Sequence, residues 1–200
     1  MIWADDPVKK TSLSCHRPRL FSLMAAVAFL CAMTSGLVRA ADSADACLLF
    51  SQADASGLLL KDVSPGISRA ATLPAGSSCR YTYSEGGEVY GLTLVHCTDA
   101  TIAEEGVHDS AAEVMSRQLR ARKGNETASS LLRILPAMGD EAFWDGTSLW
   151  MRKGAHLVRI TPNPHLEGAY ADMAAADAAR RESSLGLAVQ ASETILPRLP

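Results

Sequence analysis

The sequence lacks the short motifs that usually identify an enzyme or a cofactor-binding protein. It has no glycine-rich phosphate loop after an expected strand, no CxxC clip and no pair of histidines four residues apart. Internal repeats and low-complexity tracts are also absent, apart from an alanine bias towards the C-terminus. We therefore assign no catalytic, cofactor-binding or metal-ligating residue and predict no cofactor.

A surplus of basic charge is missing as well. The chain has 19 lysines and arginines against 22 acidic residues, and residues 41–200 hold 14 against 20, a net charge of −6. Phosphate binding requires a basic surface that releases counterions. Nucleic acid is therefore not an expected partner.

An apolar stretch over residues 21–40 follows a basic lead that contains Lys9, Lys10, Arg17 and Arg19. This pattern is typical of a secretory signal peptide, and the small residues Val38 and Ala40 favour cleavage after Ala40. We predict a signal peptide at 1–40 and a periplasmic or secreted protein. The alternative is a retained membrane anchor, which the polar residues of the second half disfavour. Neither Cys31 nor Cys47 follows a lipobox.

The remaining chain divides into a short leader, 41–46, and a single domain, 47–200, which is long enough to bury its own core. It keeps three cysteines, and an oxidising compartment favours one disulfide with one thiol left over. We predict the pair Cys47–Cys79, because Cys47 precedes an expected helix and Cys79 opens an expected strand. Cys97 is then a buried free thiol, and Cys47–Cys97 is the rival pairing.

The pattern of elements predicts an α+β fold with an antiparallel sheet packed by helices. Capping-box sequences at 51–54 and 110–113 open two helices, the first to about residue 60 and the second to about residue 123. Alternating or apolar runs predict strands at 67–73, 79–84, 89–97 and 131–135. An alanine-rich segment, 169–196, is expected to form a long closing helix.

Two dipeptides, Asp145-Gly146 and Lys153-Gly154, have the composition of two-residue hairpin turns. Counting outward from the second turn pairs Leu149 with Val158 and Trp150 with Leu157. One sheet face then carries Leu149, Met151, Val158 and Ile160. The opposite face carries Phe143, Trp150, Arg152, Leu157 and Arg159.

Several short motifs together resemble a family of small exported bacterial proteins of unknown function, many of them lipoproteins, with a PsbP-like α/β sandwich. The motifs are Cys47-Leu48-Leu49 before Ser51-Gln52-Ala53-Asp54, Cys79-Arg80-Tyr81, Gly139-Asp140-Glu141-Ala142-Phe143 and Arg152-Lys153-Gly154. The resemblance implies a PsbP-like sandwich over about 47–196 but no chemistry. The chain departs from it at Leu60, where a glycine is common, and in lacking a lipobox.

Other polar groupings are expected to be structural. Asp140 and Glu141 stand at the mouth of a strand, where a turn or cap role is favoured over acid–base work. His96 and Cys97 are strand neighbours that point to opposite faces, so they cannot act as a base and nucleophile. His96, His108, Asp109, Glu104 and Glu105 lack the spacing of a metal site.

The candidate partner-binding residues are Phe143, Trp150, Arg152, Leu157 and Arg159. If their face is open to solvent, aromatic anchors beside guanidinium groups suit a protein partner or an acidic ligand. If the closing helix covers it, which we favour, they are core residues with arginines at the rim. The expected function is a non-enzymatic binding module for a protein or cell-envelope component. The alternatives are a carrier of a small molecule or metal and, least favoured, an exported hydrolase.

Overall fold

The computed structural model describes residues 45–72 and 74–200. The predicted signal peptide, 1–40, lies outside these residues. Helices and strands follow the chain in this order: α1 (Ala46–Leu49), α2 (Gln52–Leu59), β1 (Ile67–Thr72), β2 (Ala75–Glu85), β3 (Glu88–Thr98), α3 (Asp99–Glu105), α4 (Ala111–Lys123), α5 (Glu126–Leu131), β4 (Arg133–Ile134), β5 (Glu141–Trp144), β6 (Leu149–Lys153), β7 (His156–Asn163), α6 (Met173–Ile195) and a closing 3₁₀ turn, η1 (Leu196–Arg198).

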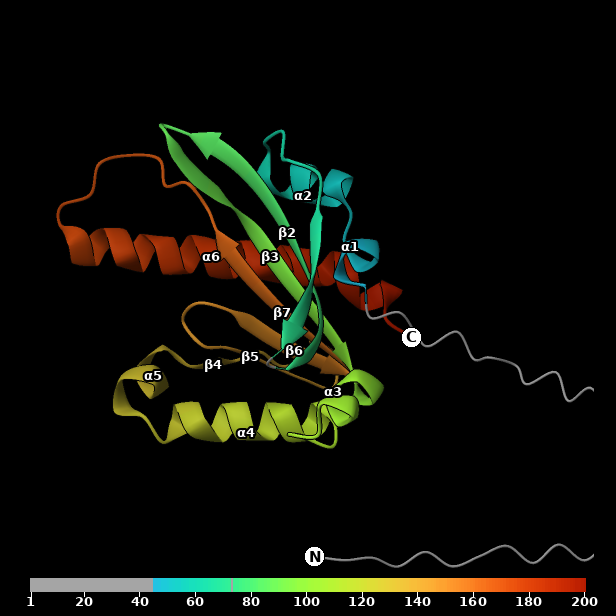
Figure 1. Ribbon diagram of the computed structural model, residues 1–200. Coiled ribbons are helices and arrows are strands. Elements are labelled where there is room, and N and C mark those ends of the chain that lie inside the picture. Colours follow the sequence, from blue (N-terminus) through green and yellow to red (C-terminus); the bar gives the residue numbers. More distant parts are fainter. Residues whose placement is uncertain (1–44, 73) are drawn as a thin grey trace, which may run out of the picture. The chain divides into compact units, whose positions relative to one another are not determined.

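The seven strands form one antiparallel sheet in the order β1-β2-β3-β7-β6-β5-β4. Two meanders, β1 to β3 and β4 to β7, join where β3 pairs with β7. The predicted α+β class, antiparallel sheet and long C-terminal helix are therefore confirmed. Figure 1 shows α6 running across one side of the sheet and α4 lying near β5 and β6.

The first sheet face is covered by α1, α2 and α6. Its core includes Tyr81 and Leu94 from the sheet and Ala188 and Ile195 from α6, all almost fully buried. The hydroxyl of Tyr81 donates to the carbonyl oxygen of Phe50, which ties the α1–α2 connection to β2. This face thus holds the N-terminal and C-terminal helices against the same sheet.

The second sheet face is covered by α3 and α4, but only over part of its width. Val95 and Cys97 of β3 pack with Val114 and Met115 of α4 in a smaller core that also includes residues of β5, β6 and β7. The β1 and β2 positions Arg69 and Arg80 on this face stay exposed. The second face is therefore divided into a covered part and an open part.

The register of the last hairpin differs from the predicted one. Leu149 pairs with Ile160 and Trp150 with Arg159, because the turn residues are Gly154 and Ala155 and Lys153 stays in β6. Gly154 has a φ of +56°, which favours glycine at that turn position. The predicted pairs, such as Leu149 with Val158, were displaced by two residues. A displacement of two preserves the predicted division of side chains between the two faces.

The predicted two-residue turn at Asp145-Gly146 was also wrong. Trp144 pairs with Leu149, so four residues form the connection. The Asp145 carboxylate accepts hydrogen bonds from the backbone N–H groups of Thr147 and Ser148, which fixes the longer loop. An aspartate that caps its own loop replaces the tight turn expected from the dipeptide.

Helix ends follow the predicted caps with two differences. Ser51 and Asp54 form the predicted capping box of α2. Ser110 caps α4 as predicted, but the Glu113 carboxylate accepts from the N–H of Asp109 and not from that of Ser110. Leu60 ends α2 in the left-handed conformation, with a φ of +52°, in which glycine is the usual residue.

The segment predicted as a strand at 131–135 is only partly a strand. Leu131 ends α5, and β4 contains just Arg133 and Ile134. Asn125 caps α5 by accepting from the N–H of Ala128, so the helix extends into the apolar run.

Candidate functional site

The predicted partner-binding face is buried. Phe143, Trp150 and Leu157 are 1%, 3% and 1% exposed and pack in the core beneath α4. The preference for a covered face was right, but the covering helix is α4 and not the closing helix. Helix α6 packs on the opposite face, against Leu149 and Ile160. These three side chains are therefore unavailable to a partner as the protein stands.

The two arginines of that face have intramolecular neighbours. Arg152 forms ion pairs with Asp140 at 2.8 Å and with Glu141 at 2.6 Å. Both carboxylates of the Asp140-Glu141 pair are thereby engaged in holding a strand end. Arg159 lies over the Trp150 ring at 5.2 Å, and burial lowers the pKa of its guanidinium.

Asp145 is the centre of the covered part of the second face. One of its oxygens accepts from Arg122, with a 2.7 Å ion pair, and from the indole N–H of Trp150 at 2.9 Å. Burial alone would raise the pKa of this carboxyl, but hydrogen bonds from Ser148, Thr147 and Arg122 hold the pKa below its usual value. The cluster stabilises the packing of α4 on β6.

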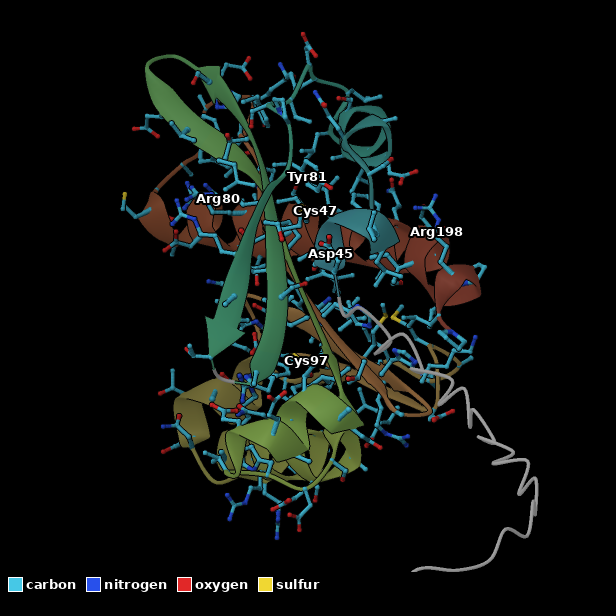
Figure 2. All side chains as sticks on the ribbon, turned by 45° about the vertical axis from the view of Figure 1, so that its right-hand side comes forward. Asp45, Cys47, Arg80, Tyr81, Cys97 and Arg198 are labelled. Atoms are coloured by element: carbon cyan, nitrogen blue, oxygen red, sulfur yellow. A yellow bond between two sulfur atoms is a disulfide. The ribbon has the colours of Figure 1, made fainter. Side chains whose placement is uncertain are left out.

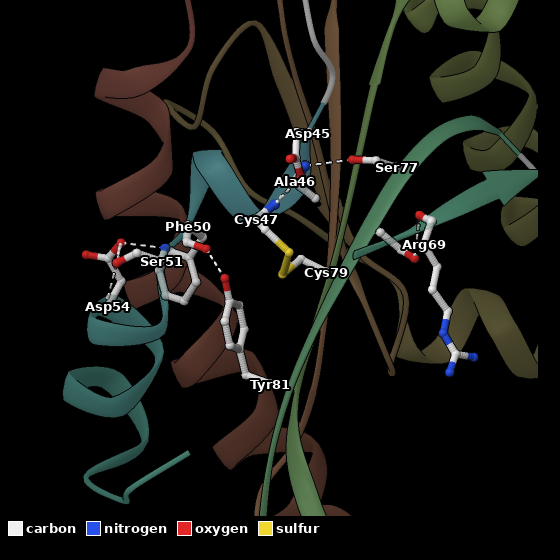
Figure 3. The surroundings of a disulfide bond; sticks show 11 residues. Asp45, Ala46, Cys47, Phe50, Ser51, Asp54, Arg69, Ser77, Cys79 and Tyr81 are labelled. Atoms are coloured by element: carbon white, nitrogen blue, oxygen red, sulfur yellow. Dashed lines mark hydrogen bonds between the residues drawn. A yellow bond between two sulfur atoms is a disulfide. The ribbon is translucent and has the colours of Figure 1, made fainter. Parts of the chain in front are cut away.

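The cysteines lie as predicted. Cys47 and Cys79 form a disulfide that joins α1 to β2, with Tyr81 nearby (Figure 3). Cys97 is free and buried, and burial raises the pKa of its thiol to about 12. A thiol with that pKa is not a nucleophile near neutral pH.

Two buried histidines meet where β3 pairs with β7. His96 Nε2 lies 3.1 Å from His156 Nδ1, and the rings stack. Burial, followed by repulsion from His156, lowers the pKa of His96 to about 4. Beside them is a cavity of about 220 Å³ lined by Asp45, Leu48, Leu49, His96, His156, Arg198, Leu199 and Pro200.

The open part of the second face contains the feature that sequence reasoning missed. A groove of about 410 Å³, here called the arginine groove, is lined by Ile67, Arg69, Ser78, Arg80, Thr82, Val89 and Thr93. Arg69 comes from β1 and Arg80 from β2. Register places both on the same face, with Arg69 opposite Ser78 and Arg80 opposite Ile67.

Both arginines point away from the first face. Figure 2 shows Arg80 on one side of β2 and Tyr81 on the other, and Figure 3 shows Arg69 on the side of the sheet away from the disulfide. Within residues 45–72 and 74–200, neither guanidinium has a carboxylate partner. The arginine groove thus offers two exposed, unneutralised cations.

One sequence signal for the groove was visible. Arg80 and Thr82 alternate with Cys79 and Tyr81, which marks one side of β2 as polar. The proximity of Arg69 could not be inferred, because it depends on the register between β1 and β2. The edge strand β1 has weak apolar patterning, so its sequence does not predict that register.

No group of three or more histidine, cysteine or acidic side chains in the described part of the chain could hold a metal ion. No helix among the described residues is both long enough and apolar enough to cross a membrane.

The fold and site together define an α+β domain with one polar, cationic sheet surface left open. Comparison of the chain with protein-family models, with curated proteins and with solved structures finds no match.

Proposed function

We propose that this protein is an exported, non-enzymatic binding module and that the arginine groove binds an anionic group of a protein or cell-envelope component. The observation that carries this proposal is the pair Arg69 and Arg80, which are exposed on one face and have no carboxylate partner within residues 45–72 and 74–200. By contrast, Arg117, Arg133, Arg152 and Arg198 all form ion pairs within the molecule.

The charge balance makes this pair significant. Residues 41–200 carry a net charge of −6, and although exposed cations also occur at Arg120 and Lys123 of α4, Arg69 and Arg80 line one groove together. An arginine guanidinium binds carboxylate or phosphate through two parallel hydrogen bonds. Thr93, half-buried in the same groove, adds a hydroxyl that can donate to such a ligand. An anion is therefore the ligand class that fits.

The disulfide supports the exported location. Disulfides persist in oxidising compartments and are rare in the cytosol. The Cys47–Cys79 bond agrees with the secretory signal pattern predicted at 1–40. An extracytoplasmic binding module would meet envelope components directly.

The proposal that no reaction is catalysed is supported by the state of the reactive side chains. The Cys97 thiol is buried, the imidazoles of His96 and His156 contact each other, and Asp140 and Glu141 both pair with Arg152. Among the described residues, we find no nucleophile in contact with an available base.

The test is crosslinking of the full chain, expressed in its own host, followed by mass spectrometry of the captured envelope components. The doubly substituted variant Arg69→Gln, Arg80→Gln is expected to lose at least about tenfold of the specific crosslinked product. The matched control is Arg120→Gln, Lys123→Gln, which removes two exposed positive charges from α4, outside the groove. Equal loss in both variants, or in neither, would reject the arginine groove as the binding surface.

A small-molecule carrier is the second candidate function, and the cavity beside His96 and His156 is the observation that favours it. Its volume of about 220 Å³ is below the range of about 300–1,000 Å³ usual for ligand pockets. We therefore rank it behind the groove. A dose-dependent rise in melting temperature with a neutral small molecule would reverse this ranking.

A further inference from the structure

One edge of the sheet is open for pairing. Within the described residues, β1 pairs only with β2 and forms the end of the sheet. Five of its six residues, from Ile67 to Thr72, are exposed, and Ala71 is partly buried. An edge strand presents a row of backbone N–H and C=O groups that another strand can engage.

Apart from the charge of Arg69, the β1 edge lacks the devices that usually block such pairing. Its register with β2 runs without interruption from Ile67 to Thr72, so the strand contains no bulge. It contains no proline or lysine, and Ser68, Ala70 and Ala71 are too small to obstruct a neighbouring backbone. The opposite edge, β4, has only two residues, which are too few to template a strand.

We propose that an extended acidic segment of a partner protein adds to β1 as an eighth strand, with alternate glutamates directed into the arginine groove. This inference rests on the proposed function and names its ligand class. Backbone pairing would supply affinity, and the two arginines would select the acidic side chains.

The spacing of the strands sets which side chains can meet. Neighbouring strands lie about 4.8 Å apart, so an acidic residue opposite Arg69 meets its guanidinium directly. An acidic residue opposite Ile67 is about two strand spacings, or about 10 Å, from the backbone of Arg80. Glutamate and arginine are long enough to span that gap together. Residues opposite Ile67 and Arg69 are two positions apart in the added strand, which predicts a Glu-x-Glu pattern.

Charge also decides between a foreign strand and a second copy of this chain. Antiparallel pairing of β1 with β1 would bring the two Arg69 side chains, and the neighbouring Arg80 side chains, onto one joined surface. Like charges on facing strands are destabilising. Charge complementarity at Arg69 and Arg80 therefore favours an acidic partner over a homodimer, with the acidic side chains at this end of β1 and away from Thr72, which shares a cavity with Glu104 and Glu105.

The first test uses a short synthetic peptide of alternating glutamate and valine, capped at both ends, added to the full chain. We expect salt-sensitive binding and amide hydrogen exchange slowed at least about tenfold within β1. A peptide with glutamine in place of glutamate should bind at least about tenfold more weakly. A peptide with alternate amides N-methylated on its pairing edge should also lose binding, because it keeps its charges but cannot form the ladder.

The second test uses Ala70→Pro and Ala71→Pro as a matched pair. Neighbouring residues of a strand direct their N–H groups to opposite edges, so one variant loses an outward N–H and the other loses a β1–β2 hydrogen bond. The variant that keeps the wild-type melting temperature carries the outward substitution. That variant should lose peptide binding at least about tenfold while Arg69 and Arg80 remain in place.

The outcomes separate the two proposals. Peptide binding that depends on Arg69 and Arg80 but leaves β1 exchange unchanged, or survives N-methylation, would overturn strand addition and leave the groove as an anion site. Envelope capture indifferent to Arg69→Gln, Arg80→Gln would overturn the proposed function itself. Concentration-dependent dimerisation that protects β1 without peptide would show that the edge serves a second copy and would overturn the acidic partner.

Discussion

The covered and open parts of the second sheet face use arginine in opposite ways. A row of directly paired residues crosses both parts, from Arg69 through Ser78 and Val95 to Arg159 and Trp150. At one end, Arg159 lies over the Trp150 ring in the part of the face that α4 covers. At the other end, no helix of the described chain covers Arg69, and no carboxylate neutralises it. An arginine under a helix has a structural role, whereas an arginine that no helix covers can bind a ligand.

The difference follows from where the carboxylates lie. Asp145 meets Arg122 because α4 crosses the sheet above the β5–β6 connection. A buried cation left without a partner is costly, and Asp145 offsets that cost for Arg122. An exposed arginine is solvated and carries no such requirement. Arg69 and Arg80 can therefore stay unpaired at little cost to stability.

The largest expected effect tests the covered part. Asp145→Ala removes the acceptor of the Arg122 guanidinium and of the Trp150 indole, and we expect unfolding free energy to fall by about 3–5 kcal/mol. Urea unfolding measures the loss. Asp177→Ala, which breaks an exposed pair with Arg180, is the control, with an expected change below about 1 kcal/mol. Equal losses in the two variants would mean that burial beneath α4 does not strengthen the interactions of Asp145.

The second prediction concerns the support of the open part. The strands β1 and β2 lie mostly outside the part that α4 covers, and they are held by α1 and the disulfide at the first face and by hydrogen bonds between Ala75 and α3. Replacing Cys47 and Cys79 together by alanine is expected to lower stability by about 3–4 kcal/mol, since the bond closes a loop of 32 residues. Hydrogen exchange should rise more in β1 and β2 than in β5 and β6. An equal rise of the exchange rate in all four strands would mean that the disulfide does not support the open part more than the covered part.

The third prediction concerns His96 of β3, whose side chain lies beside α1 on the first face, opposite the covered and open parts of the second face. The folded-state pKa of His96 is about 4 against 6.5 for the free side chain, so the unfolded chain binds a proton first. Stability is fully present above about pH 6.5 and is lost as the pH falls towards 4, by about 3 kcal/mol.

Urea unfolding between about pH 7 and about pH 4 tests this dependence. His96→Gln should reduce the pH slope, whereas His108→Gln, outside the buried pair, should retain most of it. An unchanged slope in His96→Gln would assign acid sensitivity to other groups.

The smallest expected effect completes the comparison. Arg80→Gln should change unfolding free energy by less than about 0.5 kcal/mol, because its side chain is exposed and has no carboxylate partner in the described part of the chain. Arg122→Gln should cost several times more, because it leaves Asp145 buried without its cation. Differential scanning calorimetry of the two variants measures both effects. A large loss in Arg80→Gln would show that the groove arginines are structural.

Much of the fold could be predicted from local patterns. The capping serines Ser51 and Ser110 located two helices, and alternation in β2 located its buried aromatic side. The division of β6 and β7 into two faces was correct because a shift of two residues leaves the pleat unchanged. The Cys47–Cys79 bond was also predicted correctly.

The candidate site could not be predicted in the same way. The composition of a binding surface is present in Phe143, Trp150 and Leu157. The sequence alone does not predict which helix packs over these side chains. Helix α4, which precedes them in the chain, packs over them and buries them. Arg69 and Arg80 become neighbours only through strand pairing, and the signal that matters is the absence of a carboxylate nearby. The sequence cannot show that no carboxylate lies nearby, because this depends on how the chain folds.

The two ends of the segment 45–200 meet at one small cavity, and this has a topological consequence. Asp45 and Pro200 both line the cavity beside His96, while Lys153 donates to the carbonyl oxygens of Leu196 and Leu199. Residues 45–200 are thus closed almost into a ring. A short linker could join those ends in a circular permutant, opened at the exposed Gly168. The new termini would lie between β7 and α6, so fusion partners could be attached there without interrupting β1 or β2.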